Sequence, residues 1–366
     1  MSRIAILTSG GDAPGMNTAL RAATLIAAQQ GVEVVGIERG YDGLLSRTWR
    51  PLTRSIGGQL APSAEIDASG HLGGSVLGSA RCKAFYQPEG RAQAAAALRE
   101  FDGLVVIGGN GSLTGAHALA TEHGVRVVGI PASIDNDIGC TATAIGVDTA
   151  LNTIVEACDR ISDTARAHRR AFVVEVMGRQ SGYLCMAGAI AAGADAALYR
   201  EDGRDEDAIV ESVAATIRRG FAGDRGKQRV LVLKAEGVEV PCTKLVRRLT
   251  ELLEGELPDV SIRATVLGHL VRGGSPSFLD RMVASRFALA AVGTLLAGET
   301  DQMVAWQTPL RTPRQDGGGV ETPDRSVTRW PLSTVLDETE RLLDGRSPVT
   351  QQRVAMMQSV AGVLSI

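Results

Sequence analysis

The feature that most constrains the fold is a repeated alternation of short apolar runs with segments of helical periodicity. Arg3–Thr8, Val32–Glu38, Gly103–Ile107 and Val125–Ile130 read as strands, because each is short and mainly apolar. Segments with helical spacing, such as Met16–Gln30, lie between them. This order is typical of a parallel sheet with helices on both faces.

The alternation resumes in the second half of the chain. Arg170–Val176, Val230–Leu233 and Arg263–Leu267 are further expected strands, while Val147–Arg166 and Leu332–Asp344 are expected helices. We therefore predict an α/β protein with two doubly wound, Rossmann-like three-layer lobes whose sheets are mainly parallel.

Two stretches are expected to be loops. Residues 57–80 hold many Gly and Ser, and Thr308–Arg325 is rich in Gly, Pro, Thr and Arg. We expect the second of them to lie on the surface.

Composition excludes several classes of protein. With 366 residues, 44% hydrophobic and 22% charged, the chain is typical of a globular protein with ample core. A formal net charge of −3 gives no reason to expect a nucleic-acid or membrane partner. The first residues enter a strand without a leader-like segment, so we expect a cytoplasmic location. The five cysteines are widely spaced and odd in number, which predicts free thiols rather than disulfides or a metal framework.

Two carboxylates follow one of the predicted strands. Pro131 ends the run Val125–Ile130, and Asp135 and Asp137 come in the loop beyond it. Open α/β sheets bind their ligands at the carboxyl ends of the strands. A carboxylate pair there can take a proton from an alcohol and hold a metal ion.

Glycine-rich loops follow two other predicted strands. Ser9–Gly15 and Gly108–Ser112 each lead from a strand into a helix, where backbone N–H groups can approach phosphate oxygens. Tight structural turns are the alternative interpretation. The sequence lacks a Walker-type phosphate loop and the protein-kinase signatures. It also lacks a Gly-x-Gly-x-x-Gly after the first strand, and this absence disfavours dinucleotide oxidoreduction.

Basic residues gather at the ends of the later strands. Arg170 and Arg179 bracket one strand, Arg263 lies in another, and His269 and Arg272 follow it in the loop 268–276. Arginine binds phosphate with two parallel hydrogen bonds, so the set suggests a phosphorylated substrate. For any single one of these arginines, solvation of the surface is the favoured interpretation, and His269 alone would more often be a structural histidine.

Six segments together carry a resemblance to a known family. The matching segments are Leu7–Asn17, Gly78–Arg81, Ile107–Ser112, Ile134–Asp137, Val174–Arg179 and Arg263–Pro276. They resemble the phosphofructokinase family of the bacterial glycolytic type, in the family's order and over residues 1 to about 300. The resemblance implies transfer of the γ-phosphoryl group of ATP to the 1-hydroxyl of fructose 6-phosphate, with Mg²⁺.

The resemblance also implies roles for individual residues. Asp135 would be the general base, Ser133 would lie near the transferred group, and Arg179 would close over the sugar. Asn110 and Asp137 stand at the positions that serve the metal. The nucleotide would contact Gly11, Tyr41, Arg81, Cys82, Gly109, Asn110, Gly111 and Ser112. The sugar phosphate would contact Ser133, Ile134, Asp135, Arg170, Met177, Gly178, Arg179, Glu236, Arg263, His269 and Arg272.

The family's architecture implies domain boundaries and an oligomer. Residues 1–140 with about 255–306 would form a nucleotide-binding lobe, and 141–254 with about 307–366 a sugar-phosphate-binding lobe. In this family the equivalents of Arg170 and Arg263 come from a neighbouring subunit, which implies a homotetramer or homodimer.

Departures from the family pattern leave alternatives open. Asn110 replaces an acidic residue, which predicts weaker Mg²⁺ binding. Gly111 is the form that admits ATP, whereas pyrophosphate-using relatives carry Asp there, and Ala132 matches neither type. Leu25 replaces an expected effector-site Arg. The alternatives are a pyrophosphate-dependent kinase, a kinase of another phosphosugar such as sedoheptulose 7-phosphate, or a weakly catalytic ligand-binding paralogue.

Overall fold

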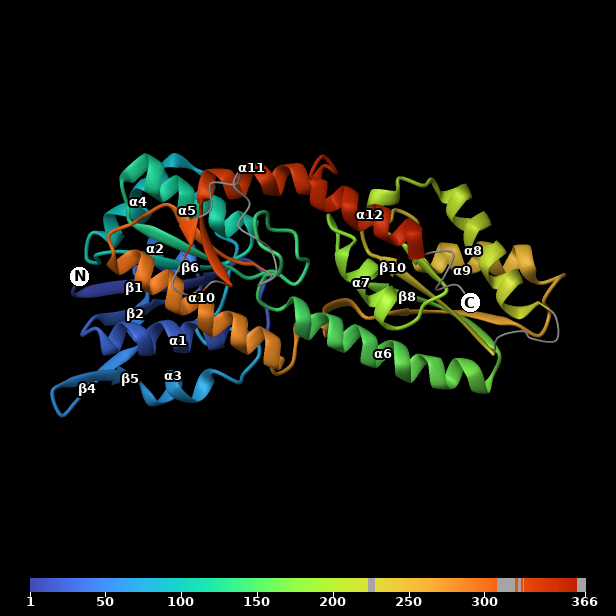
Figure 1. Cartoon of the computed structure of the whole chain (residues 1–366), viewed down its shortest axis with the longest axis horizontal. Helices are drawn as coiled ribbons and strands as arrows, with labels where there is room; N and C mark the ends of the chain where they lie inside the picture. Colours follow the sequence, from blue (N-terminus) through green and yellow to red (C-terminus); the bar gives the residue numbers. More distant parts are fainter. Residues whose placement is uncertain (223–227, 308–319, 322–323, 325, 361–366) are drawn as a thin grey trace. The chain divides into compact units, whose positions relative to one another are not determined.

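The structure is a computed structural model of the chain, shown in Figure 1, and it describes residues 1–222, 228–307, 320–321, 324 and 326–360. The chain divides into two compact units. Unit 1 comprises Met1–Ile134, Ile138–Thr149 and Arg272–Glu340, and unit 2 comprises Asp135–Asp137, Ala150–Val271 and Arg341–Ile366.

Unit 1 is built on an eight-stranded sheet with the order β13-β14-β12-β7-β6-β1-β2-β3. The five central strands run parallel, and antiparallel strands complete both ends. Their bounds are β1 (Arg3–Ser9), β2 (Glu33–Ile37), β3 (Trp49–Pro51), β6 (Leu104–Gly108), β7 (Val127–Pro131), β12 (Gln302–Trp306), β13 (Val320–Glu321) and β14 (Val327–Pro331).

Helices cover both faces of this sheet, as Figure 1 shows. On one face, α1 (Met16–Gln29) packs beside α10 (Phe278–Leu296). On the other lie α4 (Pro88–Leu98) and α5 (Asn110–His123), with α2 (Tyr41–Ser46) against α4. The central strands β1, β6 and β7 are almost wholly buried, which explains their continuous apolar sequences.

Unit 2 has a four-stranded parallel sheet with the order β11-β8-β10-β9. The strands are β8 (Arg170–Val176), β9 (Ala196–Leu198), β10 (Arg229–Ala235) and β11 (Ser261–Val266). One face packs on α8 (Glu206–Phe221) and α9 (Cys242–Leu253) in a single buried cluster. On the other face lies α7 (Tyr183–Ala191), whose Gly188 lies against Ile154 of α6 (Val147–Ala167) and Leu233. The prediction of a mainly parallel α/β fold is confirmed.

One predicted loop contains regular structure. Residues 57–80 include β5 (Gln59–Pro62), which pairs with β4 (Thr53–Ile56), and the helix α3 (Ala64–Ser69). The hydroxyl of Ser63 accepts a hydrogen bond from the N–H of Ile66 and so caps the start of this helix. The abundant Gly and Ser of the segment concealed this capping signal.

The units also differ from the expected domain boundaries. Residues 255–271 fall in unit 2 because β11 pairs with β8, and the described residues between 307 and 340 fall in unit 1 because β14 pairs with β12. Most of the predicted surface loop Thr308–Arg325 lies outside the described residues; Val320–Glu321 forms the short strand β13.

Two expectations from composition can be compared with the structure. All five cysteines are free thiols, as predicted, and four of them are buried. In the described parts of the chain, no helix combines the length and the apolar character that a membrane span requires.

Candidate active site

The loop after β1 is shaped by glycines that no other residue could replace without strain. Gly10 and Gly15 have φ values of +88° and +109°, in the region that favours glycine. A Cβ atom on Gly15 would lie 2.7 Å from Cγ2 of Ile145. Gly15 is also the N-cap of α1, so the loop ends where the N–H groups of a helix begin. Such a terminus favours an anion.

A second segment, residues 72–79, is fastened to this loop. The side chain of Asn17 donates from Nδ2 to the carbonyl oxygens of Leu72 and Gly73, each at 3.1 Å, and accepts from the N–H of Val76 at 2.8 Å. The hydroxyl of Ser79 donates to the carbonyl oxygen of Gly10. The segment that leads to Arg81 is therefore tied to the first glycine-rich loop.

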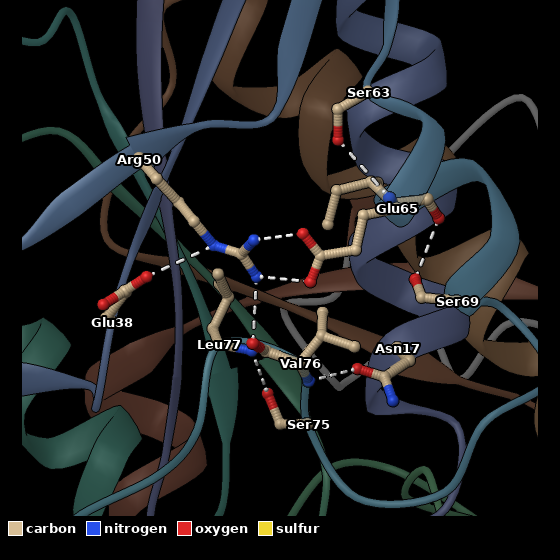
Figure 2. Close-up of polar contacts among 10 residues, drawn as sticks. Asn17, Glu38, Arg50, Ser63, Glu65, Ser69, Ser75, Val76 and Leu77 are labelled. Carbon is tan, nitrogen blue, oxygen red and sulfur yellow. Dashed lines mark hydrogen bonds and ion pairs between the residues drawn. The ribbon is translucent and has the colours of Figure 1, made fainter.

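An ion-pair network holds the same segment from the other side, as Figure 2 shows. The guanidinium of Arg50 forms a bidentate pair with Glu65, donates from Nη2 to the carbonyl oxygen of Val76 at 3.0 Å, and lies 3.3 Å from Glu38. Hydrogen bonding to Arg50 lowers the pKa of Glu65. Because Arg50 is on β3 and Glu65 on α3, the network links Val76 to two regular elements.

Arg81 and Cys82, which follow this segment, differ in exposure. Arg81 is exposed, whereas Cys82 is 7% exposed. Burial raises the pKa of the Cys82 thiol. Cys82, a predicted nucleotide contact, therefore has little side-chain surface to offer.

The loop after β6 brings the second glycine-rich segment beside the first. A Cβ atom on Gly108 would lie 2.5 Å from the carbonyl oxygen of Ser9, so the close approach requires glycine. The N–H of Ala132 donates to the carbonyl oxygen of Gly108 at 3.0 Å. The loops after β1, β6 and β7 are thereby joined at one edge of the sheet.

The predicted nucleotide contacts at the start of α5 differ in how exposed they are. Ser112 is buried, Asn110 is half-buried, and Gly109 and Gly111 present backbone. A Cβ atom on Gly111 would meet nothing within 4 Å, so open space adjoins it. This arrangement offers backbone N–H groups at a helix N-terminus to a phosphate.

Tyr41, which is predicted to contact the nucleotide, has a buried and supporting position. Its ring is 4% exposed and stacks on Phe85 with centroids 3.9 Å apart. Its hydroxyl donates to the carbonyl oxygen of Ser112 at 2.6 Å, and burial raises its pKa. A ring so covered offers little surface to a base, and it instead braces the first turn of α5.

The aspartate loop follows β7. The side chain of Ile134 is fully buried, so any contact of Ile134 with substrate would involve its backbone. Asp135 and Asp137 are half-buried on either side of Asn136, which is 1% exposed and has a φ of +47°. Asn tolerates the left-handed region better than most residues, which suits it to this turn. The N–H of Ser133 donates to the carbonyl oxygen of Ile145.

The donor set is compatible with Mg²⁺ bound together with phosphates. Among the residues described, no group of three His, Cys, Asp or Glu side chains gathers to form a metal cage. Mg²⁺ is commonly held by one or two carboxylates with substrate phosphates and water. Asp137 can supply one such carboxylate, and the predicted role of Asn110 at the metal is untested.

In unit 2, the predicted sugar contacts divide between the two ends of one parallel sheet. Met177–Arg179 follow β8, Glu236 follows β10, and His269 follows β11. Close packing joins the first two loops, since a Cβ atom on Gly237 would lie 2.2 Å from the carbonyl oxygen of Arg179. The Arg179 side chain is 84% exposed, and its Nε lies 3.9 Å from Glu236.

Arg170 and Arg263 are not part of that group. Arg170 is the first residue of the seven-residue strand β8, and Arg263 pairs with Phe172 near the same end. At about 3.3 Å per residue, the strand puts roughly 20 Å between Arg170 and the loop after Val176. Within one chain, Arg170 and the 177–179 loop are therefore too far apart to hold the same phosphosugar.

Arg272 lies in unit 1, against the first glycine-rich loop. Its Nη1 donates to the carbonyl oxygen of Asp12 at 3.2 Å, and a Cβ atom on Gly11 would lie 3.0 Å from the same nitrogen. Its predicted contact with the sugar phosphate is untested, and its present neighbours are residues of the nucleotide side.

Sequence reasoning missed Asp280, which fixes the backbone of residues 146–149 at the start of α6. This buried carboxylate accepts from the N–H groups of Gly146 and Thr149, each at 2.8 Å, and from the Thr149 hydroxyl at 2.6 Å. Burial raises its pKa. A signal was available, because Ser277 three residues earlier caps the start of α10 by accepting from the N–H of Asp280.

Comparisons with known proteins agree with this geometry. The family model described as Phosphofructokinase matches residues 3–295. A protein of Thermotoga neapolitana named ATP-dependent 6-phosphofructokinase is 44% identical over 311 residues, which are 84% of this chain and 90% of that one.

Solved structures share the fold. A phosphofructokinase chain from Saccharomyces cerevisiae matches with a TM-score of 0.78 and 27% identity; the match covers 99% of this chain and half of the yeast chain. A pyrophosphate-dependent phosphofructokinase from Marinobacter aquaeolei matches with a TM-score of 0.72 and 21% identity, over 92% of this chain and 84% of the other, which shows the fold alone. On the family match and the 44% identity, this chain belongs to the phosphofructokinase family.

Proposed function

We propose that this chain transfers the γ-phosphoryl group of ATP to the 1-hydroxyl of fructose 6-phosphate, giving fructose 1,6-bisphosphate in glycolysis. The observation that carries the proposal is the joining of two glycine-rich loops, after β1 and β6, to the start of the loop after β7, which leads to the two aspartates. The chain is also 44% identical to a protein named ATP-dependent 6-phosphofructokinase.

In the proposed reaction, the chain mainly positions the reactants and neutralises charge. Asp135 accepts the proton of the 1-hydroxyl as its oxygen attacks the γ-phosphorus, and the bond from that phosphorus to the β,γ-bridging oxygen breaks to release ADP. Backbone N–H groups at Gly11 and at the start of α5, with Arg81, stabilise the phosphate charge. Arg179 and Glu236 orient the sugar. Mg²⁺ bound at Asp137 would supply further positive charge to the phosphates.

The open space at Gly111 supports ATP as donor. No side chain crosses that place, and an adjacent carboxylate would repel a nucleotide phosphate. The Asn110 amide removes one negative charge from the metal side, so we expect a higher requirement for Mg²⁺ than an acidic residue would give.

The separation of Arg170 from the 177–179 loop supports a homo-oligomer. If a neighbouring subunit supplies Arg170 and Arg263, its arginines can bind the 6-phosphate of a sugar held by Met177–Arg179. Arg263 is exposed on β11, the outermost strand in the order of the unit 2 sheet. Isologous pairing would then complete two sites at once. A cytoplasmic location is in keeping with a glycolytic reaction.

A panel of donors against acceptors tests the proposal. ATP and pyrophosphate are each combined with fructose 6-phosphate and sedoheptulose 7-phosphate, and product is measured by mass spectrometry. We expect turnover with Mg-ATP and fructose 6-phosphate above every other combination. Pyrophosphate as the better donor, or binding of both substrates without product, would overturn the proposal.

A further inference from the structure

The C-terminal helix α12 (Pro348–Val360) brings one arginine to the proposed site. It is anchored on unit 2, where Met357 packs in a buried cluster with Met186 of α7 and Tyr199. Figure 1 shows α12 running beside α7. This helix lies beyond residue 295, where the match to the family model ends. Its contacts are therefore a feature of this chain that the family match does not describe.

Arg353 of α12 contacts the middle of the aspartate loop. Its Nη1 and Nη2 both donate to the carbonyl oxygen of Asn136, each at 3.3 Å. Asn136 separates Asp135 from Asp137 and has the left-handed backbone described above. Two charge-assisted donors on one oxygen restrain the direction of that peptide group. The backbone that carries both carboxylates is restrained with it.

The same guanidinium contacts a second part of the proposed site. It lies over the ring of Tyr183, 4.4 Å from the centroid, as a cation–π pair. Tyr183 is the first residue of α7, and the N–H of the preceding Gly182 donates to Oε1 of Glu201 at 2.7 Å. Arg353 thus joins the aspartate loop to the helix that follows the 177–179 loop.

The environment of Arg353 differs from that of a solvating surface arginine. A guanidinium on a helix surface normally keeps its charge in water. Here burial lowers the pKa of Arg353, while Coulombic interactions with Tyr183, Glu201 and Asp137 favour the charged form. Taking a cation out of water costs free energy unless good partners offset it, and the Asn136 carbonyl oxygen and the Tyr183 ring are such partners.

We propose that Arg353 is a positioning residue for phosphoryl transfer, which holds the Asn136 peptide so that Asp135 and Asp137 keep the direction that the reaction needs. The inference rests on the proposed roles of those two aspartates. Arg353 acts through the backbone of the loop and has no role in binding either substrate.

Three variants test the kinetic consequence. Arg353→Met removes the charge with little loss of volume, Arg353→Lys keeps the charge but not the fork, and Gln352→Met is the control on an exposed position of the same helix. A misdirected reacting group can cost about 100-fold, so we expect Arg353→Met to lower kcat by about 10- to 100-fold. The KM values for ATP and fructose 6-phosphate should stay within about threefold, because ground-state binding is untouched. Arg353→Lys should recover part of kcat.

Hydrogen exchange measured by mass spectrometry tests, independently of activity, whether Arg353 restrains the aspartate loop. The peptide containing residues 135–137 should exchange faster in Arg353→Met than in the wild type or Gln352→Met, since the loop opens more often. If the wild type makes no product while this difference in exchange is observed, the proposed function fails, but the restraint of the loop by Arg353 is supported.

Two results would overturn the inference. One is a kcat for Arg353→Met within twofold of the wild type. The other is unchanged exchange at 135–137 with only a lower melting temperature, which would mean that Arg353 merely stabilises α12. If Arg353→Met does not fold, Arg353→Lys tests the inference by the same two measurements. We then expect a smaller loss of kcat and a smaller increase in exchange at residues 135–137.

Discussion

The nucleotide half, in unit 1, and the sugar half, in unit 2, hold their proposed contacts in different ways. In unit 1, Asn17, Arg50 and Ser79 fasten the nucleotide-side segments to one another through hydrogen bonds within the unit. In unit 2, Arg179 and Arg263 on the sugar side are exposed, and Arg170 lies at the other end of β8. A preformed half loses little conformational freedom when it binds, whereas exposed arginines must still be ordered. On the proposed function, we therefore expect nucleotide recognition to depend on unit 1 alone and recognition of the sugar phosphate to need a neighbouring subunit.

The largest expected effect comes from the proposed general base. Asp135→Ser should lower kcat by several powers of ten, because the base and its charge are both lost. Steady-state assays would measure it, with Asp163→Asn on the exposed surface of α6 as control. A loss of less than tenfold would remove Asp135 from the role of base.

One substitution at Gly111 should disrupt nucleotide binding in the preformed half. Gly111→Asp should lower kcat/KM for ATP by about 100-fold, because a carboxylate would face the nucleotide phosphates in low dielectric. It should not harm the fold, since the space is open and an acidic residue suits a helix N-terminus. Gly111→Ala is the matched control and should behave as the wild type. Equal losses of kcat/KM in both variants would show that the added volume, and not the charge, weakens the use of ATP.

A substitution in the sugar half should change KM for fructose 6-phosphate only. Arg263→Met should raise KM for fructose 6-phosphate by about tenfold, as expected for the loss of a charged phosphate contact of about 1.5 kcal/mol. KM for ATP should not change. Arg247→Met, an exposed arginine on α9, serves as control. A rise in KM for ATP would contradict the division between the two halves.

The smallest effect concerns the network of Figure 2. Arg50 lowers the pKa of Glu65, so the pair stabilises the fold above the ordinary carboxyl pKa and loses that effect as pH falls through the lowered value. Because Glu65 is 57% exposed, the effect is below about 1 kcal/mol. Glu65→Gln should lower the melting temperature slightly at pH 7 and not at pH 3. An equal decrease at both pH values would argue against the ion pair.

The sequence predicted the sheet strands well and the supporting contacts poorly. The strand β8 has the predicted bounds, because a buried parallel strand is a continuous apolar run. The placement of Arg272 against Gly11 and the burial of Tyr41 depend on packing between distant segments. Arg353 lies 217 residues from Asn136, and no local pattern indicates such a contact.

The most direct test of the contrast between the halves mixes two impaired chains, of which Asp135→Ser lacks the base and Arg263→Met binds the sugar phosphate weakly. Asp135→Ser and Arg263→Met chains, differently tagged, are co-expressed and assayed at low fructose 6-phosphate. If a neighbouring subunit supplies Arg263, random assembly creates sites with both an intact base and an intact arginine, and about a quarter of wild-type activity should return. Activity no higher than the mean of the two variants would contradict a shared sugar-phosphate half.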